Sequence, residues 1–182
     1  MFFEKRSLDN YVPSPSREEA AGNHTEYIYQ GNWIVWDCSV SRRKSVKSRC
    51  IFGMAATVIL FLVSGTARCH SNLYPPVAVF SLLSMAALLF AFLGVCSFSW
   101  KQEKLPEYDF HWLTLKLQYG FLLHSILISL ASLFSFLLAE AERSELFPIE
   151  LRVASGYLLC AGISFFLYRN VKSLSHHMEP GA

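Results

Sequence analysis

Charged residues are scarce in this chain of 182 residues: Asp, Glu, Lys and Arg account for 16%, against 53% hydrophobic residues. So little charge with so much apolar content excludes a disordered chain. The net charge of +2 is also too small for a protein that binds nucleic acid through its phosphates. We therefore expect an ordered chain with no nucleic-acid partner.

Recognisable catalytic and metal-binding motifs are absent. The five cysteines are an odd number without a Cys-x-x-Cys spacing, which argues against a dense disulfide scaffold and against a structural zinc site. The chain also lacks a Gly-rich phosphate loop, a Gly-x-Ser-x-Gly elbow and a His-Glu-x-x-His motif. We predict no catalytic residue, no cofactor, no metal ligand and no enzyme activity.

What the sequence does have is long stretches without Asp, Glu, Lys or Arg. A spanning helix needs about 20 mainly apolar residues, with a range of roughly 17–25. The stretches near this length are residues 51–67, 75–100, 117–139 and 153–168, of which the first and the fourth are short. The sequence predicts an all-α integral membrane protein whose residues 50–169 form a four-helix transmembrane bundle.

The distribution of Lys and Arg predicts the orientation. Cations gather before the first span, between the second and third spans, and after the fourth. Both termini are therefore predicted to be cytoplasmic, in the plasma membrane or an endomembrane. The cytoplasmic parts are an N-terminal arm (1–49), expected to be largely flexible, and a tail (170–182).

Small residues recur at helical spacing on several spans. In lipid, such residues let helix backbones approach closely. The faces comprise Ser84, Ala87, Ala91 and Gly94 in the second span, Ser125, Ser129 and Ser132 in the third, and Gly156, Cys160 and Ser164 in the fourth. We expect them to pack the bundle, and a face left over would bind another membrane protein or a second copy of this chain.

His124 is the only histidine within the uncharged runs. An intramembrane histidine is a functional candidate by default, either in a proton relay or in a hydrogen bond between helices. No acidic residue lies within the runs to pair with it, which favours the hydrogen bond. A polar path near His124 and the third-span serines is the feature that a small transporter or channel subunit would need.

A basic cluster precedes the first span and consists of Arg42, Arg43, Lys44, Lys47 and Arg49. It serves as an orientation signal, and each cation beside anionic lipid gains about 1 kcal/mol. Ser45 completes an Arg-Arg-x-Ser sequence that resembles a kinase site. A phosphate there would add about −1.5 to −2 charge and weaken attachment of the arm to lipid.

Aromatic residues lie just before this cluster, in residues 27–36. Tyr and Trp favour the membrane interface, so we interpret this segment as interfacial. The alternative is a motif to which a partner protein docks. Asn23-His24-Thr25 is a glycosylation sequon that is modified only if the arm is translocated.

Several of these residues also carry a family resemblance. Gly31-Asn32-Trp33, Trp36-Asp37-Cys38 and Cys50, with Phe110-His111-Trp112 and Tyr119-Gly120, resemble the first extracellular loop and the last-helix entry of the claudin and peripheral myelin protein superfamily.

The resemblance covers about residues 31–139 and implies an extracellular loop, a Cys38–Cys50 disulfide and cell-surface or junctional organisation. It departs from the family because no helix precedes the motif and a fourth span follows. It also opposes the Lys and Arg bias, so a cytoplasmic and an extracellular arm both stay open.

Together these features predict a non-enzymatic tetraspan protein that acts as a membrane organiser or accessory subunit. Its partners would be the lipid bilayer, anionic lipid at the basic cluster, and other membrane proteins or itself. A small transporter or channel subunit is the alternative.

Overall fold

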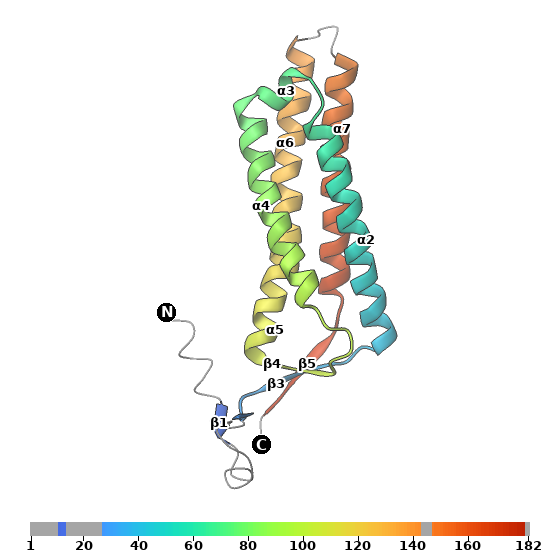
Figure 1. Ribbon diagram of the computed structural model, residues 1–182. Helices are drawn as coiled ribbons and strands as arrows, with labels where there is room; N and C mark the ends of the chain where they lie inside the picture. The colour runs from blue at the N-terminus through green and yellow to red at the C-terminus, as the bar shows by residue number, and fades with distance from the viewer. Residues whose placement is uncertain (1–10, 14–26, 143–146, 181–182) are drawn as a thin grey trace, which may run out of the picture.

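The computed structural model describes residues 11–13, 27–142 and 147–180. In this part of the chain, four helical segments are long and apolar enough to cross a membrane (Figure 1). They are α2 (Val40–Gly65), α4 (Pro75–Ser97), the continuous segment Glu107–Ala141, and α7 (Phe147–Lys172). The predicted all-α fold with a four-helix transmembrane bundle is confirmed.

Helix α2 begins well before the uncharged run, at Val40. Ser39 caps it, because the Ser39 hydroxyl accepts a hydrogen bond from the backbone N–H of Arg42 at 3.3 Å. A helix of 26 residues is about 39 Å long, longer than the roughly 30 Å hydrocarbon core of a bilayer. The last part of the predicted arm (1–49) is therefore helical, because the uncharged run marks only the part of the helix that lies in hydrocarbon.

The third spanning segment contains a local change of helix type. It consists of α5 (Glu107–Thr114), the π-helix η1 (Leu115–Tyr119) and α6 (Gly120–Glu142). The helix thus begins before the predicted start of the span at residue 117. In α4, Pro75 and Pro76 occupy the first helical turn, where a missing N–H costs little.

The helices pack in pairs around α6 and α7. Helix α6 contacts α4 and α7 extensively, α2 contacts α7, and α2 makes few contacts with α4. Every small residue predicted for the packing faces of α4 and α7 is buried. The bundle interior is therefore built on the small-residue faces that the sequence indicated.

Gly120 permits the closest approach of α4 and α6. A Cβ atom added at Gly120 would lie 2.9 Å from the backbone N and Cα of Ala91. A Cβ added at Gly94 would lie 3.1 Å from the backbone N of Leu117. Because Gly94 and Gly120 have no side chain, the backbone of α4 lies directly against the backbone of the third spanning segment, next to the π-helix η1.

A short segment that includes α3 (His70–Leu73) connects α2 to α4 and is fixed to α7 by a buried carboxylate. Glu150 is 2% exposed; it accepts a hydrogen bond from the backbone N–H of His70 at 3.0 Å and another from the hydroxyl of Ser71. Tyr157 of α7 donates to Asn72 at 2.9 Å. Burial raises the pKa of the nearby Cys69 thiol. Polar side chains of α7 thus hold this connection in place.

Strands form at the opposite end of the bundle, where the sequence analysis predicted none. The central strand β3 (Trp33–Trp36) pairs antiparallel with β4 (Lys104–Pro106) on one side and with β5 (His176–Glu179) on the other. We name these three strands the terminal sheet. A separate pair joins β1 (Tyr11–Pro13) to β2 (Tyr27–Tyr29).

Candidate functional site

The terminal sheet joins three segments that are far apart in the sequence. Strand β3 comes from the N-terminal arm, β4 from the loop between α4 and α5, and β5 from the tail (Figure 1). Ile34 and Leu105 are buried beneath it. Trp36 packs its ring against Phe98 and Phe110, at centroid distances of 6.0 and 5.4 Å. Trp36, one of the aromatic residues predicted to lie at the membrane interface, therefore anchors the sheet to the bundle.

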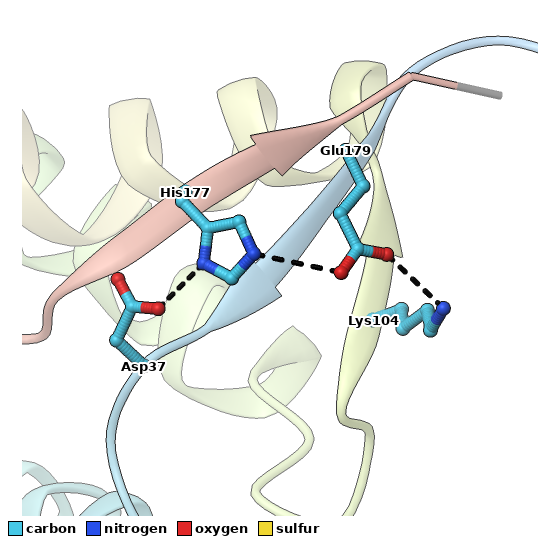
Figure 2. A network of polar contacts seen from close by, with 4 residues as sticks. All are labelled: Asp37, Lys104, His177 and Glu179. Carbon is cyan, nitrogen blue, oxygen red and sulfur yellow. Dashed lines mark hydrogen bonds and ion pairs between the residues drawn. The ribbon is translucent and has the colours of Figure 1, made fainter.

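A polar network crosses the exposed side of this sheet (Figure 2). The Oδ1 atom of Asp37 lies 2.5 Å from Nδ1 of His177, and Nε2 of His177 lies 3.5 Å from Oε1 of Glu179. Lys104 donates to Oε2 of Glu179 at 3.2 Å. The network, named here the sheet clasp, links β5 to β4 and to the residue that follows β3.

The geometry of the sheet clasp favours a charged histidine. A carboxylate only accepts hydrogen bonds, so two carboxylates facing both ring nitrogens of His177 require both nitrogens to carry hydrogen. Hydrogen bonding to Asp37 raises the pKa of His177. Hydrogen bonding to Lys104 lowers the pKa of Glu179. The sheet clasp is thus most complete when His177 is protonated and Glu179 is ionised.

We expect β5 to be held most firmly at mildly acidic pH. The raised pKa of His177 means that its contribution is complete below the ordinary value of 6.5 and is lost as the pH rises through the raised value. The lowered pKa of Glu179 means that its contribution is complete above 4.5 and is lost as the pH falls through the lowered value. Amide hydrogen exchange of residues 176–179, corrected for intrinsic rates, should accelerate as the pH rises from about 6 to 8.

Substitution of each tail histidine separates this effect from general destabilisation. His177→Gln should remove the pH dependence of the corrected exchange rates. His176→Gln is the control, because the His176 ring packs on Phe110 at 4.4 Å and belongs to no carboxylate pair. An unchanged pH profile in His177→Gln would disprove the role assigned to the sheet clasp.

Sequence reasoning missed the sheet clasp. His177 and Asp37 are 140 positions apart, and a pair of adjacent histidines in a tail is typical of a solvated segment. The one available signal was the alternation of His177 and Glu179, which places both on the same face of a strand. In the described part of the chain, no group of three or more His, Cys, Asp or Glu residues is arranged to hold a metal ion.

The basic cluster contacts protein more than the sequence indicated. Arg43 is 2% exposed and its Nε donates to the carbonyl of Trp100 at 3.2 Å. Lys47 donates to the carbonyl of Phe98 at 2.6 Å, beside the C-terminal end of α4. Carbonyls at a helix end lack partners within the helix and attract cations, which explains the contact of Lys47 with the C-cap residue Phe98. The prediction that the whole cluster faces lipid is wrong for Arg43.

The other cations of the cluster lie at the surface. Arg42 donates to the carbonyl of Ser173 at 3.2 Å, Arg49 donates to Asn170 at 2.9 Å, and Lys44 lies 5.3 Å from the centre of the Trp100 ring. Their attraction to anionic lipid stays a prediction.

Ser45 and Asn23 are the two predicted modification sites. Ser45 is exposed on α2, so its hydroxyl is accessible in the folded chain. Asn23 lies outside the described residues. Modification of both residues stays a prediction.

Cys38 and Cys50 are both buried and both free. Val40 and Cys50 are ten positions apart in α2, a rise of about 15 Å, so the start of this helix lies between the two thiols. The structure thus contains no Cys38–Cys50 disulfide, and the pairing that the claudin resemblance implies for a translocated arm stays a prediction.

Three of the four predicted intramembrane polar residues form hydrogen bonds with other helices. Nδ1 of His124 lies 2.8 Å from the carbonyl of Ser84, which joins α6 to α4. Ser125 and Ser132 donate to the carbonyls of Ala161 and Ala154 on α7, at 3.0 and 2.7 Å. The expected interhelical hydrogen bond of His124 is therefore present.

Ser129 differs from its two neighbours on the predicted face. Its hydroxyl donates to the carbonyl of Ser125 within α6, at 2.8 Å. Ser125 and Ser132 are two helical turns apart and face α7 together, whereas Ser129 lies slightly off that line. The predicted face of α6 therefore includes two helix-linking serines rather than three.

Comparison with known proteins adds no relative. Neither the protein-family models, nor the curated proteins, nor the solved structures gave a match to this chain.

Proposed function

We propose that this tetraspan protein is not an enzyme and acts as a membrane organiser or accessory subunit, with the terminal sheet as its contact surface outside the bilayer. The observation that supports this proposal is the strand order β4–β3–β5, in which β5 has a strand neighbour on one side only among the residues that the structure describes. His176, His177 and Met178 of β5 are exposed. An exposed edge strand offers backbone hydrogen bonds to a strand of another protein.

The interior of the bundle supports the same class of function. The hydroxyls of Ser125 and Ser132 and the Nδ1 atom of His124 lie at carbonyls of neighbouring helices. A solute path needs polar groups that face an open channel, whereas these groups hold helices together. The intramembrane part thus supplies a stable base for a surface at the sheet end.

Removal of β5 should abolish partner binding. We expect a chain truncated after Ser175 to insert in membranes but to lose the proteins that co-purify with the full chain in mild detergent. A chain truncated after Pro180 keeps β5 and is the control. Capture of the same proteins by both truncated chains would contradict the proposal.

Solute flux tests the alternative function. The full chain in proteoliposomes should conduct no more ions than protein-free vesicles do. Flux that His124→Ala abolishes would replace the accessory proposal with a transporter or channel.

The proposed orientation places the terminal sheet in the cytoplasm. In a Cys96→Ser background, an impermeant maleimide should label Met178→Cys only after the plasma membrane is permeabilised, because Met178 is 54% exposed in the tail. Ala141→Cys, at the exposed other end of α6, is the control for the opposite side. Labelling of Met178→Cys in intact cells would contradict this orientation.

An outward-facing terminal sheet is what a claudin-like, junctional role would require. In that case Asn23 would also be glycosylated, and its endoglycosidase-sensitive band would disappear in Asn23→Gln. The proposed orientation predicts that endoglycosidase treatment changes the gel mobility of neither the unaltered chain nor Asn23→Gln.

A further inference from the structure

A groove lies between α2 and α4 on the lipid-facing side of the bundle. Helix α2 packs mainly on α7 and α4 mainly on α6, so the two helices leave space between them. The apolar section of the groove has a volume of about 240 Å³. Each helix contributes four apolar residues, among them Val58 and Phe61 from α2 and Leu89 and Phe92 from α4.

The groove changes character toward the end of α2. A second section of about 360 Å³ adjoins the first, since Phe61, Leu62 and Met85 line both. Its polar residues are Thr66, Asn72, Ser81 and Tyr157. Gly65 and Thr66 mark the end of a spanning helix, where lipid headgroups lie. The groove is therefore apolar at the depth of acyl chains and polar at the depth of headgroups.

The polar section can accept hydrogen bonds but has few hydrogens left to donate. The hydroxyl of Thr66 donates to the carbonyl of Leu62, and that of Ser81 donates to the carbonyl of Ala78. Each hydroxyl oxygen retains acceptor capacity.

The other two polar residues of this section are engaged in the same way. The hydroxyl of Tyr157 donates to Asn72, and the amide nitrogen of Asn72 donates to the carbonyls of Ser64 and Ala67 at 2.8 and 2.9 Å. A ligand that fits this end must supply the hydrogen, as a hydroxyl group does and a phosphate diester does not.

The lining also lacks charge. Neither section is lined by Asp, Glu, Lys or Arg, so nothing there would neutralise an ionised headgroup. We propose that this groove binds a sterol, with its hydroxyl group among Thr66, Ser81 and Tyr157 and its ring system between α2 and α4.

A sterol fits this space better than a two-chain neutral lipid does. The two sections together are in the range of a small-molecule site, about 300–1,000 Å³, and form one slot between two helices. A diacylglycerol also carries a donating hydroxyl, but one slot leaves its second chain outside. Phe61 and Phe92 can pack flat against fused rings. The site is independent of the terminal sheet and of the proposed accessory function.

Photolabelling of the full chain tests this site. The probe is a cholesterol analogue that carries a diazirine and an alkyne, added to phosphatidylcholine vesicles that contain the purified protein. Labelled peptides should map to residues 54–66 and 81–92, and excess cholesterol should reduce their labelling about tenfold. Cholesteryl methyl ether, which has no hydroxyl hydrogen, and dioleoylglycerol should not compete.

Two tryptophan variants of similar exposure separate the groove from the general lipid surface. Leu89→Trp fills the groove, and Leu89 is 57% exposed, so the core is not disturbed. Leu159→Trp lies on α7, outside both sections, at 59% exposure. We expect labelling to fall at least fivefold in the first variant and to stay unchanged in the second, with both helical by circular dichroism. Val58→Trp replaces Leu89→Trp if the latter does not fold.

Three results would overturn the sterol site. They are equal labelling of α7 peptides, equal competition by dioleoylglycerol or by the methyl ether, and full labelling of both groove variants. Each of them would indicate ordinary contact with bilayer lipid.

Discussion

Replacement of Gly120 by leucine is expected to separate α4 from α6 and to lower the free energy of unfolding by about 3 kcal/mol or more. The atoms that oppose the new side chain are the backbone N and Cα of Ala91, at 2.9 Å from the added Cβ. Backbone atoms inside a helix cannot rotate away as a side chain can, so the helices must move apart. That movement also strains the bond between His124 and the carbonyl of Ser84, which joins the same two helices.

The measurement is unfolding in mixed micelles, followed by circular dichroism as the denaturing detergent increases. Gly162→Leu is the matched control, because a Cβ at Gly162 meets no atom within 4 Å and the residue is exposed on α7. Leucine is the better helix former, so the control should be neutral or slightly stabilised, by up to about 1 kcal/mol. Equal stability of the two variants would show that α4 and α6 do not cross closely.

Replacement of Glu150 by alanine is the second change with a large expected effect. The carboxylate accepts hydrogen bonds from the backbone N–H of His70 and from the hydroxyl of Ser71, and Ser71 is fully buried. Its loss leaves the buried Ser71 hydroxyl and the part-buried N–H of His70 without this acceptor, which costs about 1–3 kcal/mol for each buried group. We expect Glu150→Ala to lower the free energy of unfolding by about 3 kcal/mol and to release the connection between α2 and α4.

Hydrogen exchange distinguishes this local release from general unfolding. In Glu150→Ala the amides of residues 68–74 should exchange faster, while those in the middle of α6 keep their protection. Glu150→Gln keeps one oxygen acceptor and should lose about half as much stability. Glu103→Ala is the exposed control and should change nothing measurable. Unchanged exchange at residues 68–74 in Glu150→Ala would contradict the anchoring role of the carboxylate.

The four spans could be predicted because hydrocarbon imposes a simple rule on the chain. A crossing segment must be apolar along its whole length, so the uncharged runs mark α2, α4, α6 and α7 directly. The helix ends could not be predicted from the same rule. Charged residues such as Arg42 and Glu107 continue a helix into water without a change in backbone.

The terminal sheet could not be predicted, because its pairing is non-local. The sequence of Trp33–Trp36 is also typical of an interfacial aromatic segment. Strand β4 has only three residues, too few for a strand pattern to be recognised. The contacts that make these segments strands come from elsewhere in the chain, since Trp36 pairs with His176. The strand propensity of each segment alone does not indicate which other segment it pairs with.

The buried glutamate shows the same limit within a helix. Glu150 follows Pro148 in the first turn of α7, and its sequence context is that of a solvated connection. Only the return of α3 over the end of the bundle gives the carboxylate its donors. His124, in contrast, could be predicted, because an isolated polar side chain in lipid must find a partner in a neighbouring helix.

The strand order also constrains how the protein is made. Strand β3 is synthesised before the four described spans and β5 after them, so the last strand can pair only once all four spans have been made. With four crossings, the tail that carries β5 lies on the same side of the bilayer as the arm that carries β3. If one span fails to insert, β5 lies on the opposite side from β3. In such a chain β3 lacks its second neighbour and exposes a row of backbone hydrogen-bonding groups. A completed sheet thus distinguishes a correctly inserted chain from an incorrectly inserted one, and chaperones that bind unpaired strands have a physical basis for retaining the latter.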